Sequence, residues 1–187
     1  SATFKHEGLN QSTGYDYTRI QNPTREEVEK TIALLENGRE ALAFSCGMAA
    51  LTACVHLFKP GDHVILSEDL YGGTFRLFDE VYSVYNIESS FVDTSDIDKV
   101  KDAIETPSNP LMRVTDIKAI TDICKEKDII SIVDNTFLTP YYQKPLELGA
   151  DIVIHSATKY LGGHNDLLAG FAIANDKKII EKLRFMQ

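Results

Sequence analysis

Tryptophan is absent from the 187 residues, and cysteine occurs only at Cys46, Cys54 and Cys124. These cysteines show no CxxC spacing, so they indicate neither a disulfide framework nor a zinc site, and we expect reduced thiols in a cytoplasmic protein. No run approaches the ~20 apolar residues that span a bilayer, and no signal peptide is recognisable. The chain starts at Ser1, so a lost targeting segment stays open as an alternative.

Positive charge is also scarce. Lys and Arg number 19 against 28 Asp and Glu, giving a formal net charge of -9. This balance argues against nucleic acid or an anionic membrane as a partner. The phosphate-binding patterns GxGxxG and GxxxxGK[ST] do not occur, which disfavours dinucleotide and P-loop enzymes. The length and the hydrophobic content of 43% instead suit one large domain with a substantial core.

Apolar runs of strand length alternate with amphipathic stretches along most of the chain. This alternation predicts an α/β fold in three α/β/α layers around a mostly parallel, helix-covered sheet. The strands are expected at residues 41–44, 63–67, 87–92, 129–133, 151–155 and 168–174, and the later helices at residues 72–84, 96–104, 116–127 and 176–187.

The first helix carries start and stop signals. Pro23 precedes it, Thr24 is the expected N-cap, and Glu27 completes a capping box. Gly38 is expected to end it. The apolar residues expected to face the core are Val28, Ile32 and Leu35.

Lys159 lies in a loop just past the carboxyl end of an apolar strand, flanked by Ser156 and Thr158. It is either a solvated surface charge or a Schiff-base lysine. A Schiff-base lysine must be partly desolvated, so that its amine loses its proton well below the free pKa of ~10.4. In that case the hydroxyls of Ser156 and Thr158 would bind a phosphate.

Asp134 ends a second apolar run. It either caps the next turn or supplies the carboxylate of a pyridoxal 5'-phosphate (PLP) site, which keeps the pyridine nitrogen protonated so that the ring can accept electrons. Asp134 and Lys159, at the ends of two strands, suit opposite edges of one flat cofactor.

The motifs Asp-Asn-Thr-Phe at residues 134–137 and Ser-Ala-Thr-Lys-Tyr-Leu-Gly-Gly-His at residues 156–164 resemble the Cys/Met-metabolism family of PLP enzymes. The resemblance covers essentially the whole chain. It implies the large domain of the type I, aspartate aminotransferase-like, PLP fold over residues 23–187. Residues 1–22 would be an arm that reaches a neighbouring subunit. The family's smaller C-terminal domain, with its substrate-binding arginine, is expected to lie outside these 187 residues.

The resemblance assigns cofactor contacts to several further residues. The backbone amides of Gly47 and Met48 would bind the PLP phosphate, and Asn109 would lie near the phenolic oxygen. Tyr71 would stack on the ring and assist proton transfer. By themselves these residues suit ordinary packing or turns.

Tyr17 and Arg19 would reach across a dimer interface to the neighbour's PLP phosphate, and the planar fork of donors on arginine suits that task. Without the resemblance, they read as a surface aromatic and a solvated arginine. The implied assembly is a homo-oligomer. Two subunits would form a dimer that shares its active sites, and two dimers would form a tetramer.

The implied activity is PLP-dependent trans-sulfuration at the β or γ carbon of small sulfur amino acids. Freed Lys159 would remove the α-proton and then shuttle protons with Tyr71. The favoured activities are cystathionine γ-synthase, which joins O-acyl-homoserine and cysteine, and cystathionine γ-lyase. The alternatives are cystathionine β-lyase, methionine γ-lyase, an aminotransferase or a non-catalytic PLP-binding module. Methionine γ-lyases typically carry cysteine where this chain has Gly73.

One segment breaks the alternation of strand and helix. The helix at residues 96–104 runs straight into Glu-Thr-Pro, where family members carry a strand. We therefore expect residues to be missing between Ile104 and Glu105. A metal site formed by His164, Asn165 and Asp166 is not expected, because these residues suit loop structure.

Overall fold

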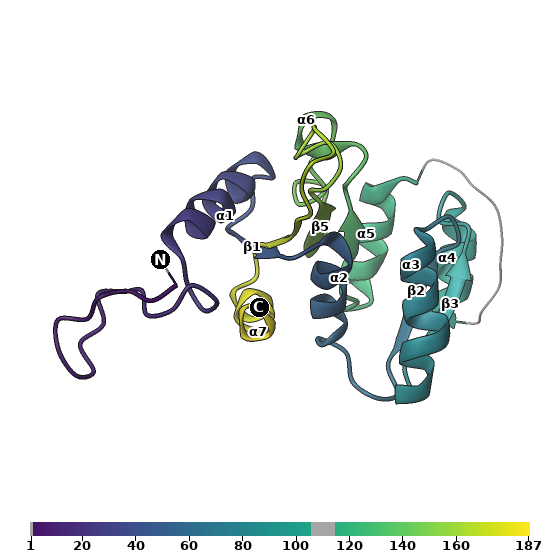
Figure 1. Cartoon of the computed structure of the whole chain (residues 1–187). Helices are drawn as coiled ribbons and strands as arrows, with labels where there is room; N and C mark the ends of the chain where they lie inside the picture. Colours follow the sequence, from purple (N-terminus) through teal and green to yellow (C-terminus); the bar gives the residue numbers. More distant parts are fainter. Residues whose placement is uncertain (1, 106–114) are drawn as a thin grey trace.

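A computed structural model of the chain describes residues 2–105 and 115–187, and only the backbone of residues 104 and 105. Figure 1 shows the arrangement of the helices and strands. In chain order they are α1 (Pro23–Leu35), β1 (Glu40–Phe44), α2 (Gly47–Val55), β2 (His63–Ser67), α3 (Gly72–Arg76), β3 (Glu88–Val92), α4 (Ile97–Glu105), α5 (Ile117–Glu126), β4 (Ile132–Asp134), α6 (Thr139–Tyr142), β5 (Ile152–Ser156), β6 (Gly170–Ala174) and α7 (Lys177–Met186). A π-helical turn (Leu77–Val81) and a 3-10 turn (Tyr82–Tyr85) continue α3.

The six strands of the described chain form two sheets. Four strands are ordered β1-β6-β5-β4, and β2 pairs with β3 in a separate parallel sheet. In the larger sheet β4 and β5 are parallel, but β6 runs antiparallel to both β1 and β5. The α/β prediction is confirmed, and the larger sheet is mixed, because β6 alone runs against β1, β4 and β5. The reason is that no helix lies between β5 and β6, and a parallel return needs such a crossover.

Both faces of the four-stranded sheet are covered by helices, with α1 on one side and α2 and α7 on the other (Figure 1). Successive side chains of a strand point to opposite faces. Ile152 and Ile154 therefore pack with α2 and α7, while Val153 packs with residues of α1. This alternation decides which side chains at the strand ends can share a site.

The cap of α1 differs from the expected one. Asn22 has extended backbone angles, and its Oδ1 accepts hydrogen bonds from the N–H groups of Thr24 (2.9 Å) and Arg25 (3.2 Å). Thr24 is already inside the helix. Pro23 explains the shift, because its fixed φ suits the first helical position, so the cap falls on the residue before it.

The buried face of α1 is also rotated from the prediction. Ile32 is buried as expected, but Val28 and Leu35 are 44% and 45% exposed, and Glu29 is buried instead. Glu29 Oε1 accepts a hydrogen bond of 2.8 Å from the Ala43 N–H of β1, the first strand in the order of the larger sheet. An unpaired strand-edge N–H needs a partner, and Glu29 supplies it by facing the sheet.

All three cysteines are free thiols, and Cys54 and Cys124 are buried. Burial raises the pKa of the Cys54 thiol to about 12. No helix in residues 2–105 and 115–187 combines the length and the apolar character needed to cross a membrane.

The cap assignment is testable by a pair of substitutions. Asn22→Ala removes the acceptor for two backbone N–H groups and should lower the free energy of unfolding by about 1 kcal/mol. Thr24→Ala, at an exposed position inside the helix, should change it by less than about 0.5 kcal/mol. Urea unfolding followed by circular dichroism measures both, and the reverse ranking would place the cap at Thr24.

Candidate functional site

The register of β4 on β5 gathers the predicted site residues at one end of the sheet. Asp134 pairs with Ile154, and Ser156 lies two residues further along β5. Asp134 and Ser156 therefore point to the same face, the one that α2 covers. Lys159 follows in the turn directly after the strand.

The Asp134 carboxylate is held by a residue two positions further along the chain. Its Oδ1 accepts hydrogen bonds from the Thr136 N–H (3.0 Å) and the Thr136 hydroxyl (2.5 Å). The same hydroxyl accepts a hydrogen bond of 2.8 Å from the Ser156 N–H. Within the described chain Asp134 Oδ2 has no partner, and the residue is exposed, so this oxygen is free to bind a ligand.

Lys159 lies in a turn in which its N–H donates to the Ser156 carbonyl (3.2 Å) and its own carbonyl accepts from the Gly163 N–H (2.8 Å). Its side chain is exposed, and its Nζ has no ion pair or hydrogen bond in the part of the chain that the structure describes. The desolvation expected for a Schiff-base lysine is therefore not provided by these residues. The Thr158 hydroxyl is occupied by the Ala169 N–H (3.3 Å).

The first turn of α2 lies against the end of β5. A Cβ placed on Gly47 would lie 2.8 Å from Ser156 Cβ, so only glycine permits this approach. The N-cap Cys46 makes no side-chain hydrogen bond, which leaves the first backbone N–H groups of α2 without a cap. An uncapped helix start with close backbone access can bind an anion. The Met48 side chain packs against the hydrophobic core between the larger sheet, α2 and α7.

The remaining predicted residues are less closely tied to this edge. Tyr71 directly precedes α3 and is 68% exposed. Arg19 stacks on the Tyr17 ring, with Cζ 5.5 Å from its centre, and lines a separate hollow of about 710 Å³ with residues of β1 and α2. No described hydrogen bond or ion pair joins Tyr17 or Arg19 to Asp134 or Lys159. Asn109 lies outside the described residues. The junction between Ile104 and Glu105, where residues were expected to be missing, lies at the end of α4.

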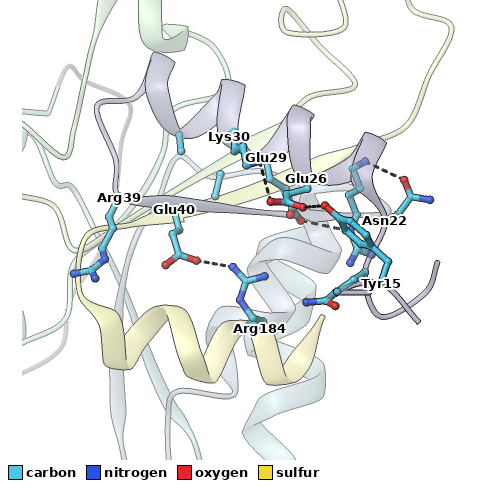
Figure 2. Close-up of a pocket in the computed structure, with 13 residues that line it drawn as sticks. Tyr15, Asn22, Glu26, Glu29, Lys30, Arg39, Glu40 and Arg184 are labelled. Atoms are coloured by element: carbon cyan, nitrogen blue, oxygen red, sulfur yellow. Dashed lines mark hydrogen bonds and ion pairs between the residues drawn. The ribbon is translucent and has the colours of Figure 1, made fainter. Parts of the chain in front are cut away.

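Another hollow, of about 510 Å³, lies between the N-terminal arm, α1, β1 and α7 (Figure 2). Two ion pairs line it: Lys30 pairs with Glu26, which accepts a hydrogen bond from Tyr15, and Arg184 pairs with Glu40. The bond to Glu26 raises the pKa of Tyr15. None of the predicted site residues lines this hollow, so it provides no support for the predicted chemistry. The described residues contain no cluster of three or more metal-ligating side chains.

Thr136 is a residue of the candidate site to which the sequence analysis assigned no role. Its hydroxyl connects the Asp134 carboxylate to the Ser156 backbone, and so ties the two strand ends together. An available signal was its position two residues after an aspartate, where Asx turns are common. The link to Ser156, 20 positions later, carries no such local signal.

Comparison with known proteins identifies the family. Residues 1–187 match the family described as Cys/Met metabolism PLP-dependent enzyme. The chain is 53% identical to the cystathionine gamma-synthase/O-acetylhomoserine (thiol)-lyase of Bacillus subtilis, over 98% of this chain and 52% of that protein. It is 49% identical to a cystathionine beta-lyase of Lactococcus lactis, over 100% and 52%. Its structure superposes on cystathionine gamma-lyase from Lactobacillus plantarum, complexed with L-serine, with a TM-score of 0.92 and 44% identity, over 100% and 51%.

The chain therefore belongs to the Cys/Met-metabolism family of PLP-dependent enzymes, and the resemblance inferred from the motifs is confirmed. It spans about half the length of the relatives that it matches. The site fits the family's cofactor, because it offers a free carboxylate oxygen, an unpaired amine and an uncapped helix start at one end of the sheet.

We expect Thr136→Val to weaken PLP retention, because it removes a hydrogen bond to Asp134 and leaves the Ser156 N–H without its partner. It should also lower the free energy of unfolding by about 1–3 kcal/mol. Thr136→Ser keeps the hydroxyl and is the matched control. Equilibrium dialysis with PLP and urea unfolding measure the two effects, and equal PLP retention in both variants would contradict the role of the hydroxyl.

Proposed function

We propose that residues 23–187 form the PLP-binding large domain of a type I PLP enzyme, and that residues 1–22 form an arm that reaches a neighbouring subunit. The observation that carries this proposal is the placement of Asp134 at the end of β4 and of the Lys159 turn directly after β5, two adjacent parallel strands, beside the uncapped start of α2. Open α/β sheets bind ligands at the carboxyl ends of their strands.

Each residue has a distinct role in the proposed site. Lys159 holds PLP covalently and, once released, takes the α-proton of the substrate on Nζ. Asp134 keeps the pyridine nitrogen protonated through its free Oδ2. Tyr71 stacks on the ring and moves protons with Lys159, while the backbone of Gly47 and Met48 binds the phosphate. PLP, when bound, supplies an electron sink for the charge left by the proton.

Further contacts complete the proposed assignment. Ser156 and Thr158 act as phosphate-binding hydroxyls; support is stronger for Ser156, because the Thr158 hydroxyl is engaged with Ala169. Asn109 is assigned to the phenolic oxygen on the family resemblance alone. Tyr17 and Arg19 are assigned to the neighbour's phosphate, which requires a homodimer with shared sites, further assembled into a tetramer. Their exposure in the single chain is compatible with an intersubunit contact.

The proposed reaction is trans-sulfuration on a small amino acid, either as cystathionine γ-synthase or as cystathionine γ-lyase. Cystathionine β-lyase is the alternative, because proteins with all three names share 44–53% identity with this chain. Methionine γ-lyase is disfavoured by Gly73. A Cβ there would lie 2.5 Å from Tyr71 Cε1, so a cysteine at this position would require the exposed Tyr71 ring to move.

We also propose that this chain lacks a short segment between Ile104 and Glu105. The cystathionine beta-lyase comparison aligns 196 positions over the full 187 residues, so about nine positions of that relative have no counterpart here. The separation of β2 and β3 from the four-stranded sheet is compatible with a lost inner strand.

The central assignment is tested at Lys159. Borohydride reduction of the PLP-loaded full-length protein should fix the cofactor on the peptide that contains Lys159, as identified by mass spectrometry. Lys159→Ala should lose this adduct, the visible absorbance band and turnover, because no amine remains at that position. Lys182→Ala removes an exposed lysine of α7 and should retain all three. An intact visible band in Lys159→Ala would refute the assignment.

Product analysis separates the candidate activities. A γ-synthase should convert O-acetylhomoserine and cysteine to cystathionine. A γ-lyase should release cysteine and an oxo acid from cystathionine, and a β-lyase should release homocysteine. Chromatography with mass detection distinguishes these products. Amino-group transfer to an added oxo acid without carbon–sulfur bond change would instead indicate an aminotransferase.

A further inference from the structure

A glutamate and a histidine are fully buried together behind the proposed cofactor site. The side chains of Glu36 and His155 are each 0% exposed, and His155 Nε2 lies 2.5 Å from Glu36 Oε1. Glu36 caps the end of α1, and His155 lies in β5, 119 positions later. Burying such a pair costs desolvation free energy that the interaction often fails to recover, so stability alone is a weak reason for it.

Two amides extend this pair into a network. Asn135 Nδ2 donates to Glu36 Oε1 (2.8 Å) and to the Gln143 carbonyl (2.9 Å). Gln143 Nε2 donates in return to Asn135 Oδ1 (3.1 Å). The network therefore joins the end of α1, the end of β5 and the loop after β4.

The members of this network alternate with the proposed cofactor residues. Asn135 directly follows Asp134, and His155 directly precedes Ser156. Because neighbouring strand residues point to opposite faces, the network lies on the α1 side of the sheet and the cofactor residues lie on the α2 side. The network therefore contacts the ends of β4 and β5 on the α1 side of the sheet. Each contact is one residue away from a group that would contact PLP on the α2 side.

Two atoms of the network have no hydrogen-bond partner among the described residues, namely Glu36 Oε2 and His155 Nδ1. A buried polar atom without a partner costs free energy, and a network selected only for stability would be expected to satisfy or replace it. The arrangement is better explained by the directional contacts that it makes to β5 and to the loop after β4.

We propose that Glu36, His155 and Asn135 are positioning residues for the cofactor, which hold the ends of β4 and β5 so that Asp134 and Lys159 meet opposite edges of PLP. This inference rests on the proposed function. According to this proposal, the network orients the cofactor in addition to any contribution that it makes to folding.

The test compares two buried substitutions in the full-length protein. Glu36→Gln keeps the shape of the side chain but weakens the bonds to His155 and Asn135. Thr121→Val is the matched control, because it removes a buried hydrogen bond from Thr121 to the Leu148 carbonyl (2.6 Å), before the amino end of β5. PLP affinity is measured by absorbance titration, and cofactor orientation by the visible circular dichroism signal per bound PLP. Both are recorded well below the unfolding midpoint of each variant.

Glu36→Gln is expected to weaken PLP binding about tenfold and to change the visible dichroism per bound cofactor, since charge-assisted hydrogen bonds contribute at least this much. Thr121→Val should lower the unfolding midpoint and leave both cofactor readouts unchanged. If both variants lose stability but bind and orient PLP like the unsubstituted protein, the positioning role is refuted.

A milder substitution covers the case in which Glu36→Gln does not fold. Gln143→Ala removes only the outer donor to Asn135 and leaves the buried pair intact, and it should shift the visible dichroism in the same direction by a smaller amount. An unchanged signal in Gln143→Ala would then overturn the proposal. Failure of the unsubstituted protein to take up PLP at Lys159 is a separate outcome, which would refute the proposed function beneath it.

Discussion

The parallel pairing of β4 with β5 is the constraint on which the site depends. β4 has only three residues, yet a slip of one residue would turn Asp134 to the α1 face and Asn135 to the α2 face. Polar contacts hold the register at both ends. Asp151 Oδ2 accepts from the Ser131 N–H (2.8 Å) at the amino end, and the Asn135 N–H donates to the Ile154 carbonyl (3.0 Å) at the carboxyl end.

Local signals in the sequence predicted most of the elements. The expected strand at residues 63–67 matches β2, and the other expected strands and later helices overlap observed ones. The errors came from choices that local patterns leave open. Pro23 was compatible with either Asn22 or Thr24 as the cap, and the rotation of α1 was set by Glu29 reaching the β1 backbone. The antiparallel course of β6 depends on a connection without a helix, which the strand pattern does not reveal.

The residues of the candidate site also fall into two groups, those that the sequence predicts and those that only the tertiary structure brings together. Asp134 and Lys159 could be proposed from their positions after apolar runs, because the ends of neighbouring strands meet at one edge. The groups that hold them could not, since Glu36 and His155 meet only after α1 has packed against the sheet. Read singly, each is a charged or polar residue in an ordinary element. Their joint burial is a property of the tertiary structure, and no spacing in the sequence predicts it.

The candidate site holds features common to the family, whereas the reaction of each member depends on further contacts. The residues gathered after β4 and β5 suit a cofactor, and the chemistry that a cofactor supplies is common to β- and γ-elimination and to γ-replacement. The way in which the rest of the substrate is held selects the carbon that loses its substituent. Holding the substrate requires contacts beyond the Asp134 carboxylate and the Lys159 amine at this edge of the sheet. Relatives with different reactions can therefore retain the same strand ends.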